Sequence, residues 1–470
     1  MFDTLVRCGQ VVCEGSITEA NIGIEGGRIA AILAPGADAP ARKVIDASGK
    51  QVIPGVIDAH HHFSTPTEPM ADTIATSSIA AVHGGVTTLI PFIQGQRDEP
   101  VKSFLERNRQ EGERTSMIDF AMHCRLATPD RKRIAQIPDA IAMGVTTFKV
   151  FLDYRKAGIM WDDYHLLALA DAVAREGALL MCHCEDGMLI DYLEDQLITE
   201  GRYGPATLLA SRPNILEAST IARVAMIAKM AGCRVHVVHL SAKEGLDEIV
   251  RAKANGVQID TETCPQYLVL NDADTRRLNC KSKIGPPLRL EADQEAMWAG
   301  LRSGAIDMVA SDHAPFRAAE KELPADRYVD VPFGMPSVET MLPLLYSEGV
   351  MKGRLTLTRM AEALSTNPAK IYGLYPQKGT IRVGSDADLV LLDPEVEWTI
   401  QVKNLHCNSD YSPYEGWKLK GKPVLSLLRG EILLDNGQLR QKAGYARYIF
   451  RQTWKPLSGV QGRCRTNTNA

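Results

Sequence analysis

The chain has no apolar run long enough to cross a membrane, and it has no low-complexity linker or short tandem repeat. Its first residues include Asp3 and Arg7, where a signal peptide would be apolar. Basic residues are not in excess either, because 53 Lys and Arg stand against 57 Asp and Glu, for a net charge of -4. We therefore expect a cytoplasmic protein that acts on a small molecule and binds neither nucleic acid nor a membrane.

The ten cysteines lack the paired spacing of a disulfide framework, as expected for reduced thiols in an intracellular protein. One triplet, Cys182-His183-Cys184, could suggest a metal site. On a strand, however, the two cysteines would face away from His183. We therefore assign both cysteines to the core and keep only the histidine as a candidate ligand.

Apolar runs alternate with helical segments through the middle of the chain. Helical periodicity follows these runs, for example in residues 163–176, 215–231 and 242–255. The candidate strands are residues 52–58, 86–92, 117–123, 145–151, 178–183, 234–240, 257–262 and 306–312. Eight such units predict the α/β class and a TIM-like (β/α)₈ barrel over residues 54–375. The catalytic groups of such a barrel lie at the C-terminal ends of its strands.

The first predicted barrel strand ends in acid and imidazole side chains. Because side chains alternate along a strand, His60 and His62 face the same way, and His61 faces the other. Two imidazoles at this spacing can bind one metal ion. A histidine-rich loop edge or an accidental cluster would produce the same stretch, so the metal site depends on the rest of the chain.

Further ligand types stand at the ends of other predicted strands, namely Lys149, His183, His239 and Asp312. With His60 and His62 they make six residues that converge on one mouth of the barrel.

Three other histidines are left out of this set. His236 starts its strand, so it should lie deeper and face the side opposite to His239. His123 and His313 also fall at strand ends, where we expect a supporting or packing role.

Lys149 lies in a run too apolar to accept an unpaired ammonium, whose burial would cost several kcal/mol. A salt bridge to a nearby carboxylate would neutralise it. Carboxylation by CO₂ would instead turn it into a carbamate anion that can bridge two cations. The neighbouring histidines and Asp312 favour the carbamate, because two divalent ions among mainly neutral imidazoles need a bridging anion.

Ordered motifs surround these candidates. Those with a candidate ligand are Pro54-Gly55-Val56-Ile57-Asp58-Ala59-His60-His61-His62, Phe148-Lys149-Val150-Phe151, His183-Cys184-Glu185-Asp186-Gly187, Val238-His239-Leu240-Ser241 and Ser311-Asp312-His313-Ala314-Pro315. Others are Glu262-Thr263-Cys264-Pro265, Gly285-Pro286-Pro287, Asn367-Pro368-Ala369 and Gly384-Ser385-Asp386-Ala387-Asp388. Over nearly its whole length the chain resembles the amidohydrolase superfamily. More narrowly, it resembles the cyclic amidohydrolases: hydantoinase and dihydropyrimidinase, allantoinase, and dihydroorotase.

The resemblance implies two zinc ions per chain. One would be held by His60, His62 and Asp312, and the other by His183 and His239, with carboxylated Lys149 and a hydroxide bridging them. Two Zn²⁺ lower the pKa of a shared water and polarise an amide carbonyl. Asp312 would then carry the proton from the attacking hydroxide to the departing ring nitrogen.

The same resemblance gives a role to Tyr154, five residues after Lys149. In the hydantoinase branch, a tyrosine at this place donates a hydrogen bond to the developing oxyanion. Main-chain groups also bind the substrate in that branch, at places that are Gly285 and Phe333 here. Phe333 brings an apolar ring to the pocket.

The residues do not all favour the same branch of the cyclic amidohydrolases. Ser64 stands where dihydroorotases carry a carboxylate-binding Arg, which argues against that activity, and Tyr154 favours a hydantoinase or dihydropyrimidinase. The stretches around Phe333 and Asp312 lean towards allantoinase or dihydroorotase. Ring opening of hydantoins or dihydropyrimidines is therefore expected first, and allantoinase second. A metal-free interaction scaffold is the non-enzyme alternative, which the six ligand types oppose.

The ends of the chain complete the expected organisation. As in the family, residues 1–53 and 376–436 should form one β-sandwich built from both termini. The basic and aromatic residues 437–470 form a tail that, in relatives, often packs on a neighbouring subunit, so we expect a homotetramer. The last ten residues could equally be partly disordered.

Replacing Lys149 by Ala should abolish activity, because it removes the bridging anion. A short carboxylic acid added to this variant should restore part of the activity by taking the place of the carbamate. Full activity of the variant in an assay of ring opening would contradict this role of Lys149.

Overall fold

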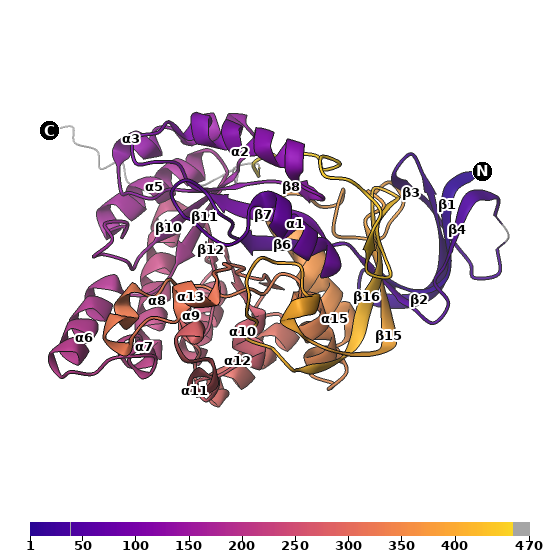
Figure 1. Cartoon of the computed structure of the whole chain (residues 1–470). Coiled ribbons are helices and arrows are strands. Elements are labelled where there is room, and N and C mark those ends of the chain that lie inside the picture. Colours follow the sequence, from indigo (N-terminus) through magenta and orange to yellow (C-terminus); the bar gives the residue numbers. More distant parts are fainter. Residues whose placement is uncertain (38, 455–470) are drawn as a thin grey trace, which may run out of the picture.

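The computed structural model describes residues 1–37 and 39–454, which form two sheets joined at residue 55 (Figure 1). The first is the parallel sheet of a barrel, and the second is a mostly antiparallel sheet made from both ends of the chain. The predicted α/β class and (β/α)₈ barrel are confirmed.

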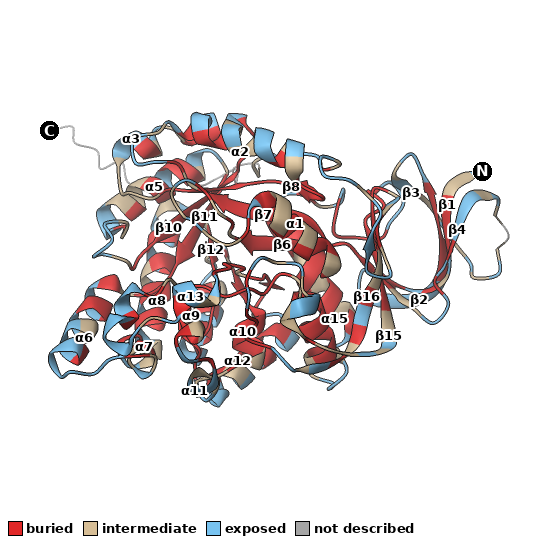
Figure 2. Ribbon diagram, in the orientation of Figure 1, coloured by how far each residue is buried: buried red, intermediate tan, exposed pale blue. Residues whose placement is uncertain are grey.

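All neighbouring strands of the barrel run parallel, in the order β6-β7-β9-β10-β11-β12-β13-β14, with β8 beside β7. Their bounds are β6 (Val56–His61), β7 (Val86–Ile93), β8 (Asp119–Phe120), β9 (His123–Arg125), β10 (Thr147–Phe151), β11 (Leu179–His183), β12 (Arg234–Val237), β13 (Ile259–Thr263) and β14 (Met308–Val309). Figure 2 shows these central strands almost entirely buried, with the exposed residues on the outer faces of the helices.

The predicted strand bounds shift by one to three residues for most strands, as where the run 234–240 ends at Val237, and three runs differ more. The run 52–58 divides between two sheets, because β5 (Gln51–Pro54) joins the second sheet and β6 begins at Val56. Gly55 stands at this crossing, where a Cβ would come within 2.1 Å of the Thr87 hydroxyl. The run 117–123 is split into β8 and β9, and the eighth strand is paired over two residues only.

The barrel closes between its first and last strands through side chains as well as the main chain. Ser311 donates from its main-chain N–H and its hydroxyl to the buried carboxylate of Asp58, at 2.9 and 2.6 Å. The His62 N–H donates to the carbonyl of His313 at 2.8 Å. This closure fixes the ends of β6 and β14, which carry the candidate ligands His60, His62 and Asp312.

The helices on the outside of the barrel follow from caps and apolar faces. Asp162 accepts from the His165 N–H at the start of α5, and Gly232 ends α8 in the left-handed conformation. Three helices match their predicted ranges to within one residue at each end. The longer helices are α1 (Ile74–His83), α2 (Val101–Thr115), α5 (Asp163–Arg175), α6 (Gly187–Thr199), α8 (Asn214–Ala231), α9 (Lys243–Ala254) and α12 (Glu291–Ser303).

The second sheet joins the two ends of the chain where β5 pairs antiparallel with β15 (Leu389–Thr399). Its strands from the N-terminal side are β1 (Phe2–Cys13), β2 (Ser16–Glu25), β3 (Arg28–Leu33) and β4 (Ala41–Asp46), and those from the C-terminal side are β16 (Lys418–Leu428), β17 (Glu431–Asp435) and β18 (Gln438–Leu439). It curves around its own apolar core, which confirms the expected β domain built from both termini. The domain limits at 53, 375 and 436 stay predictions.

Part of the predicted tail packs on the barrel of its own chain. The main chain of Arg447 and Ile449 is hydrogen-bonded to Phe120, and Tyr448 donates to the carbonyl of Met143 at 2.9 Å. Arg451 is buried and donates to the hydroxyl of Thr147 at 3.1 Å. The end of the tail, residues 455–470, lies outside the described residues, and its role as an oligomerisation arm stays a prediction.

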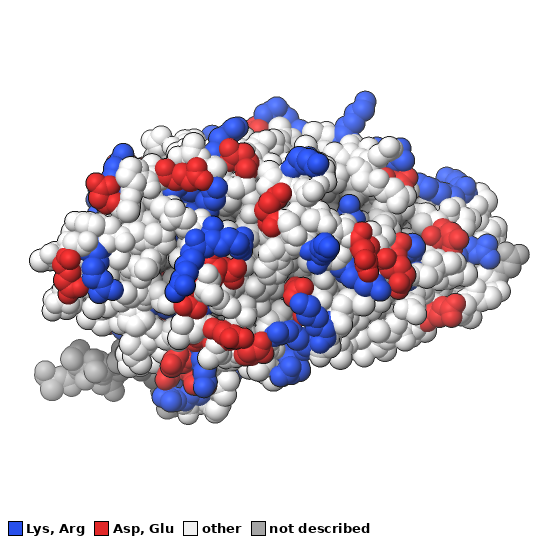
Figure 3. Space-filling model, turned by 60° about the horizontal axis from the view of Figure 1, so that its bottom comes forward, with Lys and Arg blue, Asp and Glu red and all other residues white. Residues whose placement is uncertain are grey.

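None of the helices in residues 1–37 and 39–454 has the length and apolar composition needed to cross a membrane. Acidic and basic side chains are interspersed over the face shown in Figure 3. This surface agrees with the small net charge of the chain.

A buried ionic cluster links the two sheets. The Lys378 amino group lies 2.9 Å from Asp119 in β8, and 3.2 and 2.5 Å from Asp386 and Asp388 just before β15. All four side chains are at most 6% exposed. The cation therefore holds three carboxylates that would otherwise repel one another.

Replacing Lys378 by Met should lower the free energy of unfolding by about 3–5 kcal/mol, because it leaves Asp386 and Asp388 buried without their counter-ion, whereas Asp119 keeps Arg429. Urea unfolding measures the change. Lys43→Met removes the same charge from an exposed position in β4 and should shift stability by less than about 0.5 kcal/mol. Equal unfolding midpoints for the two variants would contradict this account of the cluster.

Candidate active site

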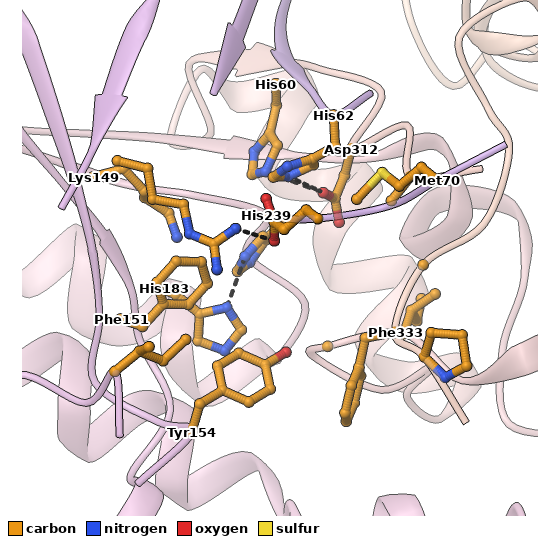
Figure 4. A pocket seen from close by; sticks show the side chains of 18 of the residues that line it. His60, His62, Met70, Lys149, Phe151, Tyr154, His183, His239, Asp312 and Phe333 are labelled. Atoms are coloured by element: carbon orange, nitrogen blue, oxygen red, sulfur yellow. Dashed lines mark hydrogen bonds and ion pairs between the residues drawn. The ribbon is translucent and has the colours of Figure 1, made fainter. Parts of the chain in front are cut away.

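A pocket with a volume of about 430 Å³ opens at the C-terminal ends of the barrel strands. Its lining includes all six candidate ligands, His60, His62, Lys149, His183, His239 and Asp312. In Figure 4, His60, His62 and Asp312 lie together on one side, His183 and Tyr154 lie on the other, and His239 lies between them. The structure thus brings together all six candidate ligands that stand at the strand ends.

His60, His62 and Asp312 form a compact group whose ligand atoms lie within 4.8 Å of one another. The Nε2 atoms of His60 and His62 lie 3.0 and 3.5 Å from the same Asp312 oxygen. Burial alone would raise the pKa of Asp312, but the charge on His60 and hydrogen bonds from both histidines hold it well below its usual range. Two imidazoles and an ionised carboxylate suit a divalent metal such as zinc.

His183 and His239 form the second group. Nδ1 of His183 lies 3.0 Å from Nε2 of His239, so two imidazole nitrogens face one point in the pocket. The other nitrogen of His183 lies 2.8 Å from Glu185 and 3.1 Å from Asp153. Arg212 binds both of these carboxylates. Because Arg212 pairs with both Asp153 and Glu185, we assign these carboxylates to the orientation of His183.

Glu262 orients His60 from inside the barrel. One of its oxygens is hydrogen-bonded to Nδ1 of His60, and the other lies 3.1 Å from Nε2 of His236. Burial would raise the pKa of Glu262, but the charge on His60 and hydrogen bonds from both histidines lower it to about 2. Sequence reasoning missed this residue, although the Glu262-Thr263-Cys264-Pro265 motif and its place on a barrel strand pointed to it.

Lys149 differs from the other buried lysines. Lys378 faces three carboxylates, Lys321 donates to three main-chain carbonyls, and Lys283 donates to two. The Lys149 amino group has no hydrogen bond or ion pair within residues 1–37 and 39–454, and lies 3.7 Å from the centre of the Phe151 ring. Burial, then the charge on Arg125, lowers its pKa to about 8. The salt bridge considered from the sequence is therefore not found in this part of the chain.

Three residues of the site have a positive φ that non-glycine residues rarely adopt. Tyr154, His239 and Asp312 have φ values of 55°, 41° and 48°. Such a conformation costs about 1–3 kcal/mol, and such residues cluster at active sites. All three follow barrel strands, and their side chains line the pocket.

Tyr154, Gly285 and Phe333 lie side by side in the pocket wall. A Cβ on Gly285 would come 3.1 Å from the Tyr154 hydroxyl and 3.2 Å from the Phe333 ring, so the glycine lets these two rings approach each other. Burial, and then the charge on Asp153, raises the pKa of Tyr154 well above its usual range. The phenol therefore stays protonated and can donate a hydrogen bond.

Residues that the sequence placed outside the site do not line this pocket. His123 and His313 hydrogen-bond within the barrel, to Ala59 and Asp72 respectively. Cys182 and Cys184 belong to the core. His236 lies deeper, as predicted. Its ring is hydrogen-bonded to Glu262 and lies beside the Tyr372 ring, so it faces the barrel interior and not the side opposite to His239.

Comparison with known proteins agrees with this geometry. Residues 51–433 match the amidohydrolase family. A D-hydantoinase of Rhizobium radiobacter is 39% identical over 441 residues, which cover 93% of this chain and 96% of that protein. An L-hydantoinase of Paenarthrobacter aurescens is 33% identical over 97% of this chain and 99% of its own. The crystal structure of a dihydropyrimidinase from Brevibacillus agri superposes with a TM-score of 0.92 at 33% identity, covering 96% of this chain and 99% of the other.

Replacing Glu262 by Gln should weaken metal binding by about 10–100-fold, because His60 loses the anion that orients its ring. Competition with a chelator, followed by metal analysis, measures the change. Asp260→Asn is the matched control, since Asp260 lies on the same strand and contacts Arg234 instead of a candidate ligand. Unchanged metal affinity in Glu262→Gln would refute this supporting role.

Proposed function

The chain belongs to the amidohydrolase family and is a cyclic amidohydrolase, and we propose that it opens the ring of hydantoins or dihydropyrimidines. The observation that carries this proposal is the meeting of four histidines, Asp312 and an uncompensated Lys149 in one pocket. The printed names of the relatives, D-hydantoinase, L-hydantoinase and dihydropyrimidinase, support this choice of ring. A metal-free scaffold would have no need to keep these six side chains together.

The proposed cofactors are two zinc ions. His60, His62 and Asp312 would hold one, His183 and His239 the other, and Lys149, carboxylated on its amino group, would link them. Imidazole and carboxylate ligands suit zinc, and a carbamate would give the buried Lys149 side chain the charge that such a pair of cations needs. When bound, the ions supply a water of lowered pKa and polarise the amide carbonyl.

Asp312 is the proposed proton carrier. Its carboxylate is ionised, because its pKa lies well below the usual range. It can therefore accept a proton from the attacking water as the new C–O bond forms. It then returns this proton to the ring nitrogen when the C–N bond breaks, which lets the nitrogen leave as a neutral group.

Tyr154 is the proposed donor to the substrate carbonyl. Its protonated hydroxyl can donate a hydrogen bond that strengthens as negative charge grows on the carbonyl oxygen, and one such donor is worth roughly 3–4 kcal/mol. Gly285 and Phe333 are proposed to bind the ring beside it. The Phe333 segment is supported by Lys321, whose amino group donates to the neighbouring carbonyls of Pro332 and Gly334.

The remaining organisation is also proposed. Residues 1–53 with 376–436 would form the β domain, 54–375 the catalytic barrel and 437–470 the tail of a homotetramer. We further propose that the enzyme is cytoplasmic.

Side-by-side assays test the proposed function. Protein supplied with Zn²⁺ and bicarbonate should open hydantoin, 5-phenylhydantoin or dihydrouracil to its N-carbamoyl product, while allantoin and dihydroorotate should react poorly. Metal analysis should find about two zinc ions per chain. Asp312→Ala serves as the inactive control. Failure on all five compounds, or activity on allantoin or dihydroorotate alone, would overturn the proposal.

A further inference from the structure

A charged pair lies in the pocket, apart from the proposed catalytic residues. Four lining residues are Asp, Glu, Lys or Arg, and two of them, Lys149 and Asp312, already have a proposed role. The other two are Glu68, on the loop between β6 and α1, and Arg125, at the end of β9. Neither has a role in the mechanism above.

The barrel sheet fixes the position of Arg125. Its Cα pairs with that of Lys149 in the parallel ladder between β9 and β10, so the two side chains enter the barrel mouth as neighbours. The guanidinium lies over the Phe151 ring, 4.5 Å from its centre. The side chain is 8% exposed. Stacking on an aromatic ring holds the plane of the guanidinium in place before any ligand binds.

Most of the hydrogen-bonding capacity of Arg125 is unused. Its Nη1 donates to Glu68, but its Nε is buried without a partner, and Nη2 has no hydrogen bond within residues 1–37 and 39–454. Nε and Nη2 form one edge of the guanidinium, which can bind a carboxylate through two parallel hydrogen bonds. A buried donor left unpaired costs about 1–3 kcal/mol, so this edge gains from a ligand with acceptor oxygens.

Glu68 balances the charge of Arg125 without filling that edge. It is hydrogen-bonded to Nη1 only, and its own main chain is held by Thr65, through bonds of 2.9 and 3.2 Å. Burial would raise the pKa of Glu68, but the charge on Arg125 holds it below its usual range. The pair is therefore neutral, and an additional anion on the free edge would compete with Glu68.

The rest of the wall is apolar and includes Met70, Phe151, Ile284, Phe316 and Phe333. In such surroundings a charged group of a substrate is costly to bury unless it meets a partner. Arg125 offers that partner at one place. A site that hydrogen-bonds a polar group of the substrate strongly rejects analogues without that group. An apolar pocket discriminates much less between ligands of similar shape.

Resting on the proposed function, we propose that Arg125 binds a carboxylate at the end of a side chain on the ring, so that the preferred substrates are cyclic ureides with a carboxyalkyl substituent, unlike dihydroorotate, whose carboxylate is attached directly to its ring. Arg125 would then be a specificity-determining residue, and Glu68 would set how strongly it binds the anion. The alternative role for Arg125 is support of the anion formed on Lys149, its neighbour in the ladder.

Two substrates of equal size test this proposal. 5-(2-Carboxyethyl)hydantoin and its carboxamide, 5-(2-carbamoylethyl)hydantoin, differ in charge at the end of the side chain. The wild-type enzyme should prefer the acid by about tenfold or more in kcat/KM. Arg125→Met should bring this ratio to about one or below, mainly through a higher KM for the acid. Glu68→Gln should raise the ratio, because it removes the competing carboxylate. Arg131→Met, an exposed arginine outside the pocket, should keep the wild-type ratio.

The outcomes separate this inference from the proposed function. If no hydantoin is opened, the proposed function fails. If hydantoin is opened but the wild-type enzyme does not prefer the acid, this inference alone fails. It is also overturned if Arg125→Met lowers the rates for acid and amide equally and loses zinc, because Arg125 would then serve the metal ligands. Should Arg125→Met not fold, the ratio for Glu68→Gln decides: an increase supports the inference, and an unchanged ratio overturns it.

Discussion

The uncompensated amino group of Lys149 is the constraint on which the site depends. Other lysines buried in this chain are surrounded by carboxylates or carbonyls, whereas Lys149 faces an aromatic ring and a neighbouring arginine. Burial and the charge on Arg125 lower the pKa of Lys149 to about 8, which makes the neutral amine, the form that reacts with CO₂, accessible near neutral pH. In the proposed centre, a carbamate on Lys149 would join the four imidazoles and Asp312 in holding two cations. The same burial that disfavours the cation would thus prepare Lys149 for the role proposed for it.

The ligand side chains are held in place by charges behind them. Glu262 orients His60, while Glu185 and Asp153 orient His183 and both form ion pairs with Arg212. The six candidate ligands stand at the carboxyl ends of five strands, β6, β10, β11, β12 and β14, and the bonds between Asp58 and Ser311 fix the first strand against the last. The rigid barrel provides the positions, and the loops around Glu68 and Phe333 complete the pocket wall.

Much of this arrangement could be predicted because local sequence determines it. Buried strands are apolar runs, and a His, Lys or Asp at the end of such a run is conspicuous, as at His60 or Lys149. Strand bounds were less predictable. Residues 51–54 are as apolar as the strand that follows, and only the pairing of β5 with β15 assigns them to the other sheet. Glu262 and Arg125 were missed because their importance comes from partners far along the chain, His60 and Glu68, which no local pattern reveals.

The most direct test is carbon-13 NMR of zinc-loaded protein prepared with ¹³C-labelled bicarbonate, with metal analysis of the same sample. The account predicts one carbamate signal per chain, absent from the Lys149→Ala variant, together with two zinc ions. An unmodified Lys149 in active, metal-loaded enzyme would contradict it.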